Sequence, residues 1–281
     1  MMKICKLIEE GKALLDEQKI DNSLYDTRRL MMEVIDKDLS FILCNPDYEV
    51  DDEKAEYFKH LLIKRSKHYP LQYILGYQEF FGLRFKVNPA VLIPRSDTEV
   101  LVEKAIKCID SDYSGSFPSV LDMCTGSGCI GISIAKNREV ELTIADKSIE
   151  ALKVATENLK SNEVSADIIC SDLFSEMVSS FDIIVSNPPY IRRDVIPTLM
   201  PEVKNFEPVM ALDGTEDGLY FYRRLAIEGR EYLNNNGHLI MEIGYDQGLD
   251  VKNILLENGF KDIEIIKDYA GNDRVVAARL D

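Results

Sequence analysis

Several residue types are rare in this chain, and their scarcity excludes certain kinds of site and classes of protein. Its 281 residues include only three His, and no two of its six Cys form a CxxC pair. We therefore expect neither a zinc site nor a disulfide framework. We expect a cytoplasmic protein with reduced thiols. Apolar runs stay below the roughly 18 residues of a membrane span, and charged residues interrupt the start, where a signal peptide needs an apolar core. We expect neither a bound metal nor a membrane partner.

Positive charge is scarce as well. The chain has 33 Lys and Arg against 49 Asp and Glu, a net charge of −16. Binding along a nucleic-acid backbone depends on a basic surface, so this balance disfavours a protein that coats DNA or RNA, although it allows a local basic patch. The length predicts about two domains, and a hydrophobic content of 46% is that of a folded globular chain.

The character of the sequence changes twice along the chain. Residues 1–72 carry three apolar stripes with helical spacing, which predict a small helical bundle, at 4–15, 24–35 and 57–65. Residues 73–96 are rich in aromatic and β-branched residues with Gly and Pro, which predicts a β-hairpin linker. Residues 97–281 form the expected second domain.

Short apolar runs alternate with helical patterns through this second domain. Strands are expected at 119–121, 142–145, 166–170, 181–185, 238–243, 263–267 and 274–278. Helices are expected at 100–109, 131–136, 149–160, 219–233 and 249–257. This alternation predicts an α/β fold whose mostly parallel sheet is covered on both faces, with the final strand pair as an antiparallel edge.

A glycine-rich loop follows the first strand of the expected sheet. Gly126, Gly128 and Gly131 fit the pattern G-x-G-x-x-G between a strand and a helix, where missing Cβ atoms let a ligand lie against the backbone. Asp146 ends the next strand about 20 residues later and is placed to accept both ribose hydroxyls of an adenosine. The alternative is a glycine-rich turn beside a helix-capping Asp.

Two further carboxylates bear on the choice of ligand. Asp122 precedes the glycines at the strand tip, where its charge would repel the pyrophosphate of a dinucleotide and attract an ammonium or sulfonium group. This favours S-adenosylmethionine over a nicotinamide dinucleotide. Asp172 follows the third strand and is placed to meet the adenine edge, unless it only caps a helix or closes a loop.

The fourth strand leads into the turn Asn187-Pro188-Pro189-Tyr190, which should face the glycine loop. The prolines fix φ and carry no N–H, which leaves the Pro188 carbonyl as a rigid acceptor. The Asn187 side-chain oxygen is a second acceptor, and Tyr190 offers a flat face. Two converging acceptors and a ring suit a planar group that carries an NH2. The alternative is a Pro-rich turn that caps a helix.

An amide or exocyclic amine nitrogen is a poor nucleophile because its lone pair is delocalised. Accepting both of its hydrogens raises the electron density at nitrogen and aligns it with a donor methyl group. This is catalysis by orientation and electrostatics, with no strong base. We therefore expect Asn187, Pro188 and Tyr190 to be catalytic, with Pro189 completing the substrate-binding turn.

These motifs resemble those of the release-factor glutamine methyltransferases, which methylate the side-chain amide of the Gln in the Gly-Gly-Gln loop of peptide chain release factors. The resemblance covers nearly the whole chain, and besides the turn it rests on PLQYILG at 70–76, FFGLRFKV at 80–87, VLIPRSDTE at 91–99 and EIGYDQ at 242–247. The turn alone is not specific, because adenine-N6 methyltransferases are similar there. Its combination with the segments at 70–76 and 92–99 is specific.

The resemblance implies a Rossmann-like class I methyltransferase domain at 97–281, with the helical bundle docking the substrate. It implies S-adenosylmethionine as cofactor, S-adenosylhomocysteine as product, a release factor as partner and no direct nucleic-acid substrate. The resemblance implies that residues 124–128, Asp146 and Leu173 bind the cofactor. Together with the residues argued above, those expected to bind it are Asp122, Cys124, Thr125, Gly126, Ser127, Gly128, Asp146, Asp172, Leu173 and Asn187. The substrate glutamine would be held by Asn187, Pro188, Pro189 and Tyr190.

The sequence departs from the family pattern at several positions. Cys124 and Thr215 stand where Gly is usual, Leu173 where Trp is frequent, and Ser96-Asp97 where the family has Pro-Glu. Arg95 and Glu242 are open between a role at cofactor or substrate and a role as salt-bridge partners.

Three other functions compete with this interpretation. An adenine-N6 methyltransferase acting on nucleic acid would use the same turn, and Arg192-Arg193 beside it would favour that substrate. A nicotinamide-dependent oxidoreductase would bind NAD at the glycine loop. A non-enzymatic interaction protein would use the helical bundle as its working part.

Overall fold

The computed structural model describes all 281 residues, whose contacts divide the chain into two compact units. The first unit contains Met1–Gly76 and Met200–Phe206, and the second contains Tyr77–Leu199 and Glu207–Asp281. The β-hairpin is therefore grouped with the second unit, and a short segment from the C-terminal half with the first. None of the helices combines the length and the apolar character needed to cross a membrane.

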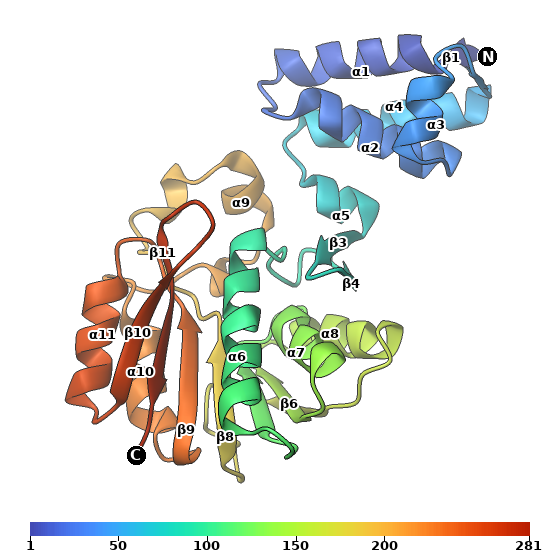
Figure 1. Cartoon of the computed structure of the whole chain (residues 1–281). Helices are drawn as coiled ribbons and strands as arrows, with labels where there is room; N and C mark the ends of the chain where they lie inside the picture. Colours follow the sequence, from blue (N-terminus) through green and yellow to red (C-terminus); the bar gives the residue numbers. More distant parts are fainter. The chain divides into compact units, whose positions relative to one another are not determined.

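The first unit is a helical bundle around one apolar core. Its helices are α1 (Ile4–Glu17), α2 (Ser23–Ile35), α3 (Leu39–Cys44), α4 (Asp52–Ser66), α5 (Leu71–Leu75) and α9 (Pro201–Phe206). The three longest helices of this unit are α1, α2 and α4 (Figure 1). They carry the stripes that the spacing predicts and bury Ile4, Leu30 and Phe58 completely. The pairing of β1 (Met2–Lys3) with β2 (Glu49–Val50) was not predicted.

Arg65 shows why α9 belongs to this bundle. Its guanidinium donates to Asp26 of α2 at 2.6 Å and to Glu202 of α9 at 2.9 Å, and its side chain is only 8% exposed. Two carboxylates around a buried guanidinium offset the cost of removing it from water. Arg65 and Glu202 lie 137 residues apart, so no local pattern signals their pairing.

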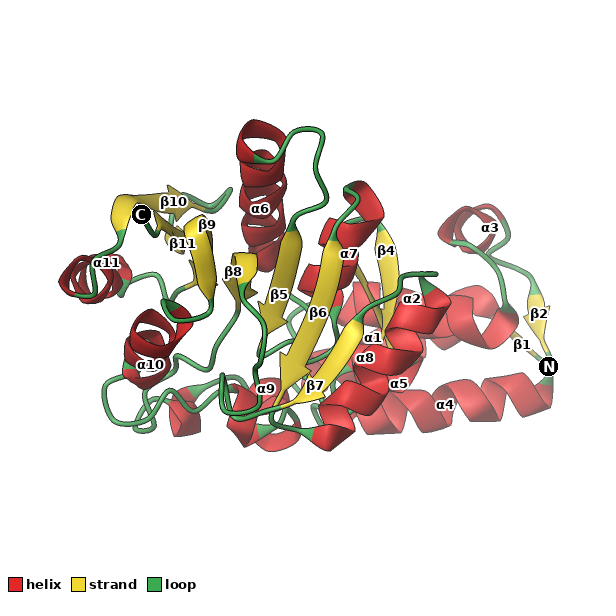
Figure 2. Cartoon of the chain, turned by 90° about the horizontal axis from the view of Figure 1, so that it is seen from below, coloured by secondary structure: helices red, strands yellow, loops and turns green.

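The second unit is built on a seven-stranded sheet in the order β10-β11-β9-β8-β5-β6-β7 (Figure 2). The strands are β5 (Ser119–Met123), β6 (Glu141–Asp146), β7 (Asp167–Cys170), β8 (Phe181–Ser186), β9 (Leu233–Glu242), β10 (Lys261–Lys267) and β11 (Asp273–Arg279). Strands β5 to β9 pair in parallel, while β11 pairs antiparallel with both β9 and β10. The expected fold class and its antiparallel edge are thus confirmed.

Alternate residues of the strands face two separate apolar cores, one on each side of the sheet. One face packs against α6 (Glu99–Asp112), α7 (Cys129–Asn137) and α8 (Ile149–Ser161), and takes Val120 and Ile183. The other packs against α10 (Tyr220–Gly229) and α11 (Gly248–Glu257), and takes Leu121 and Ile184. Burial on both faces explains why these strands read as continuous apolar runs.

The chain order creates a switch point between β5 and β8. From β5 the chain moves outward through β6 and β7, then returns to place β8 on the other side of β5. Ligands of open α/β sheets bind beyond the carboxyl ends of the strands at such a point. The glycine loop leaves β5 and the Asn-Pro-Pro-Tyr turn leaves β8, so both lie at this edge. The Ser186 hydroxyl donates to the carbonyl of Met123 at 2.8 Å and ties the two strand ends together.

Two expected boundaries were wrong. The helix expected at 219–233 ends at Gly229, which packs against the Phe174 ring, and Leu233 already begins β9 opposite Phe181. The strand and turn region expected from residue 73 begins instead with the end of α5, which Gly76 terminates at a φ of 80°. The hairpin follows as β3 (Tyr77–Phe80) and β4 (Leu83–Lys86). Three short 3-10 helices were not predicted: η1 (Ser96–Thr98), η2 (Ile196–Thr198) and η3 (Val209–Ala211).

Candidate active site

A pocket opens at the switch point of the second unit. Most of the residues expected to meet cofactor or substrate line it, namely Cys124, Thr125, Gly126, Ser127, Asp146, Asp172, Leu173, Asn187 and Pro189. The glycine loop and the first residue of the turn therefore share one cavity. Asp122, Gly128, Pro188 and Tyr190 are not among the lining residues.

The glycine loop is held by the carboxylates of two aspartates. The amide of Gly126 donates to Asp146 Oδ2 at 2.9 Å, and the amide of Ser148 donates to Asp146 Oδ1 at 2.8 Å. The Lys147 amide also donates to this carboxylate, whose lone-pair sites are not all used by the three backbone amides, so it can still accept from a ligand in the pocket. Burial raises the pKa of Asp146, and the backbone donors around it oppose that rise. Asp146 therefore closes the loop as well as lining the pocket.

Asp122 lies beneath the loop instead of in the pocket. It is fully buried, and its Oδ2 accepts from the hydroxyl of Thr125 at 2.6 Å and from the amide of Gly131 at 2.9 Å. A Cβ on Gly131 would come within 3.0 Å of the Asp122 Cβ, which explains the third glycine of the motif. Burial raises the pKa of Asp122 to about 7. The expected direct contact with a cationic ligand is thus replaced by a role in shaping the loop.

Two further positions of the loop have backbone conformations that favour glycine. Gly128 directly precedes α7 and has a φ of 82°, and a Cβ there would approach Ile132 within 2.9 Å. Cys124 has a φ of 61°, which is uncommon for a residue other than Gly. Burial raises the pKa of the Cys124 thiol, so the thiol is protonated and does not act as a nucleophile.

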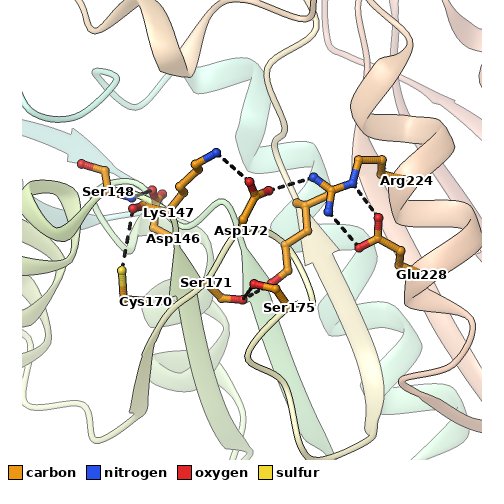
Figure 3. Close-up of polar contacts among 10 residues, drawn as sticks. Asp146, Lys147, Ser148, Cys170, Ser171, Asp172, Ser175, Arg224 and Glu228 are labelled. Atoms are coloured by element: carbon orange, nitrogen blue, oxygen red, sulfur yellow. Dashed lines mark hydrogen bonds and ion pairs between the residues drawn. The ribbon is translucent and has the colours of Figure 1, made fainter.

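Asp172 is engaged by two cations at the edge of the pocket. Its carboxylate accepts from Lys147 at 2.6 Å and from Arg224 at 2.8 Å, and Arg224 also pairs with Glu228 (Figure 3). The hydrogen bond from Lys147, followed by that from Arg224, lowers the pKa of Asp172. The carboxylate is therefore ionised and fixed, and a contact with adenine would use its remaining lone pairs. Neither Lys147 nor Arg224 was singled out from the sequence.

The Asn-Pro-Pro-Tyr turn is fixed from behind. The hydroxyl of Tyr190 donates to Glu242 Oε1 at 3.3 Å, and its backbone carbonyl accepts from Gln247 Nε2 at 3.1 Å. Gly214 packs so closely that a Cβ there would lie 2.6 Å from the Tyr190 carbonyl carbon. Burial raises the pKa of Tyr190 well above its ordinary value, so the hydroxyl stays protonated. Its ring is a rigid part of the turn.

The sequence left the roles of Arg95 and Glu242 open, and the structure places only one of them in the pocket lining. Arg95 lines the pocket and forms an ion pair with the buried carboxylate of Glu207. Glu242 is buried at the end of β9, away from the pocket lining, and accepts from the hydroxyl of Thr98 at 2.5 Å. Thr98 lies in the pocket wall and was not predicted as a site residue. No local pattern marks it, because its partner is 144 residues away.

Comparison with known proteins identifies both parts of the chain. Residues 6–76 match the family described as PrmC N-terminal domain, and residues 98–200 match the family described as Methyltransferase small domain. The release factor glutamine methyltransferase of Clostridium botulinum is 42% identical over 279 residues, covering 97% of this chain and 98% of that protein. The protein of the same name from Thermodesulfovibrio yellowstonii is 44% identical over 231 residues, 81% of this chain and 82% of its own.

A solved structure shows the fold independently of close sequence similarity. The structure of a methyltransferase from Pyrococcus furiosus matches 71% of this chain and 89% of its own, with a TM-score of 0.52 and 18% sequence identity.

Proposed function

The chain belongs to the release factor glutamine methyltransferases, and we propose that it transfers a methyl group from S-adenosylmethionine to the side-chain amide nitrogen of the Gln in the Gly-Gly-Gln loop of a release factor. One observation carries the proposal at the level of chemistry. A single pocket is lined both by the glycine loop with Asp146 and by Asn187 at the start of the Asn-Pro-Pro-Tyr turn. A methyl donor and an amide acceptor can therefore meet in one enclosed space.

The residues present fit S-adenosylmethionine. Asp146 offers carboxylate lone pairs at the end of β6, and its neighbours in the lining include the apolar side chains of Ala151 and Leu173, which suit a flat base. When bound, S-adenosylmethionine supplies an electrophilic methyl group on a sulfonium. The backbone of residues 124–127 would hold the amino acid end of the cofactor. Asp122 and Gly128 would contribute by shaping that backbone.

Asn187 and Pro188 would act on the substrate amide. Their two oxygens would accept both N–H hydrogens, which raises the electron density at nitrogen and holds its lone pair toward the methyl group. The Tyr190 ring would flank the amide, and Pro189 fixes the turn. No strong base is required, because the nitrogen loses a proton to water once it carries the methyl group.

The basic pair beside the turn supports a protein substrate over a nucleic acid. Arg192 is paired with Asp194 at 3.0 Å, and Arg193 with Asp213 at 2.9 Å. Both charges are thus balanced within the chain and do not add to the basic footprint that phosphates require.

We propose that the helical unit, which covers the PrmC N-terminal match, docks the release factor, and that the reaction takes place in the cytoplasm where release factors act.

A methyl-transfer assay tests this function. The enzyme is incubated with labelled S-adenosylmethionine and a release factor, with a Gln→Ala release factor and a DNA and RNA mixture as parallel substrates. We expect one methyl group on the loop Gln of the intact release factor and no label on the others. Label on the Gln→Ala factor, or label only on nucleic acid, would overturn the proposal.

A further inference from the structure

One buried carboxylate is linked to both ends of the Asn-Pro-Pro-Tyr turn. Glu242 and Thr98 are each 2% exposed, and the Thr98 hydroxyl donates to Glu242 Oε2 at 2.5 Å. The other oxygen, Oε1, accepts from the Tyr190 hydroxyl at 3.3 Å. Thr98 in turn faces the Asn187 side chain, with 3.5 Å between Oγ1 and Nδ2. Glu242 therefore reaches the last residue of the turn directly and the first through Thr98.

The direction of these contacts matters more than their strength. A threonine hydroxyl has a single hydrogen, and here the hydrogen is given to Glu242. Thr98 consequently presents only lone pairs to Asn187, and only the NH2 end of that amide can face them. The opposite orientation would place two lone-pair oxygens against each other. The Asn187 oxygen is thereby directed away from Thr98 and left free to accept from a substrate.

We propose that Glu242, acting through Thr98, is a positioning residue that fixes the orientation of the Asn187 amide and seats the Tyr190 ring. The inference rests on the proposed function, in which the Asn187 oxygen must accept a hydrogen from the substrate amide. A flipped Asn187 would present an NH2 group to the NH2 group of the substrate. Glu242 itself does not line the pocket, so its effect is on geometry and not on the reacting atoms.

We call the contacts that link Glu242 to Tyr190, and through Thr98 to Asn187, the relay. The groups around Glu242 make the relay depend on pH. Burial raises the pKa of Glu242 to about 6, although Thr98, Arg274 and Tyr190 favour its ionised form. Asp97 opposes ionisation, and the Tyr222 hydroxyl binds the backbone carbonyl of Glu242 at 3.0 Å. Below that pKa the carboxyl group becomes a donor toward Thr98 or Tyr190, and the Thr98 hydrogen is free to turn toward Asn187. The catalytic rate should fall as the pH drops through about 6.

Substitutions of Thr98 test the relay kinetically. Thr98→Val removes the hydroxyl at nearly constant volume and should lower kcat roughly 10- to 100-fold, with the Kd of S-adenosylmethionine changed by less than about threefold. Thr98→Ser keeps the hydroxyl and should restore most of kcat. Thr143→Val, a buried threonine of β6 outside the pocket lining, controls for the loss of a buried hydroxyl. An unchanged kcat in Thr98→Val, or an equal loss in Thr98→Ser, would overturn the inference.

A spectroscopic measurement decides the same question without methyl transfer. The side-chain NH2 signal of Asn187 is followed by NMR in protein labelled with ¹⁵N at asparagine, and is assigned by its absence in Asn187→Asp. We expect it to titrate with a midpoint near pH 6 in the wild type and not in Glu242→Gln. A signal that is insensitive to pH, or one that titrates equally in both proteins, would contradict the relay. An inactive wild type would instead overturn the proposed function and leave this readout intact.

Discussion

The two halves of the pocket are held in different ways. In the half where we propose that the cofactor binds, here called the cofactor half, the backbone amides of Gly131 and Gly126 donate to Asp122 and Asp146, which lie 9 and 20 residues from these partners. In the half where we propose that the substrate amide binds, here called the amide half, the side chain of Asn187 faces Thr98, which donates to Glu242, at separations of 89 and 144 residues. The first half is a local structure, and the second depends on where distant strands and turns end.

This difference has a functional consequence. A loop whose conformation is fixed by backbone hydrogen bonds suits a cofactor, because the same molecule binds there in every catalytic cycle. A side-chain amide whose orientation is fixed by hydrogen bonds presents its oxygen, and not its nitrogen, to the substrate. This suits the recognition of an NH2 group. Damage to the first half should therefore change cofactor affinity or loop stability, and damage to the second should change turnover.

Asn187→Ala should have the largest effect, because it removes the side-chain oxygen that we propose accepts a hydrogen from the substrate amide. We expect kcat to fall at least 100-fold, about 3 kcal/mol of transition-state stabilisation. Single-turnover methyl transfer at saturating cofactor measures it. Asn253→Ala, at an exposed position of α11 in the second unit, is the matched control and should retain activity. A fall of less than about threefold in Asn187→Ala would remove the turn from the mechanism.

Asp122 gives the cofactor half a pH-dependent stability. Its folded pKa of about 7 lies above the unfolded value near 3.9, so the folded state binds more protons between these values. The stability contributed by this site is therefore fully present in acid and is lost as the pH rises through about 7.

Asp122→Asn tests that sign. Asn keeps an acceptor for Thr125 and Gly131 but does not titrate. Between pH 5 and 7 the wild type should lose about 2 kcal/mol more of its free energy of unfolding than the variant. Urea unfolding at both pH values measures the difference, and Glu150→Gln at an exposed position of α8 should behave as the wild type. Parallel pH profiles of the wild type and Asp122→Asn would contradict the assignment.

Asp146→Asn should weaken cofactor binding without slowing the chemical step. An Asn has one acceptor oxygen for the backbone amides and a ribose, so we expect the Kd of S-adenosylmethionine to rise roughly 10-fold, about 1.4 kcal/mol. Turnover at saturating cofactor should change little. Calorimetry and saturation kinetics measure the two quantities, with Asp167→Asn at the exposed start of β7 as control. A loss of kcat at unchanged Kd would erase the distinction between the halves.

The smallest effect concerns backbone strain behind the turn. Thr215 has a φ of 74°, a conformation that favours Gly, and its amide donates to Asp213 Oδ1 at 2.8 Å. Thr215→Gly keeps that hydrogen bond and relieves the left-handed conformation, so we expect a gain of up to about 1 kcal/mol in stability. Thermal unfolding measures it. Thr156→Gly within α8 should instead be destabilising, by roughly a few tenths of a kcal/mol. A lower melting temperature for Thr215→Gly would refute the strain.

The same difference, between contacts of residues near in sequence and contacts of residues far apart in sequence, explains what the sequence could predict. In the second unit, the order of the sheet strands and of α6, α7, α8, α10 and α11 followed from apolar periodicity, and the pairing of Gly126 with Asp146 agreed with motif spacing. The link from Thr98 to Glu242 had no such signal. The bond between Arg224 and Asp172 spans 52 residues and depends on α10 facing the end of β7. Asp122 was identified by position, but its burial under the loop depends on the packing of Gly131 and was not predicted.

A crystal structure of the enzyme with S-adenosylhomocysteine and a release factor would test the proposed amide site most directly. We expect the loop Gln amide to lie at the turn, with its nitrogen donating to the Asn187 Oδ1 and to the Pro188 carbonyl oxygen and facing the cofactor sulfur. A Gln amide bound elsewhere, or an Asn187 that presents its NH2 group to the substrate, would contradict it.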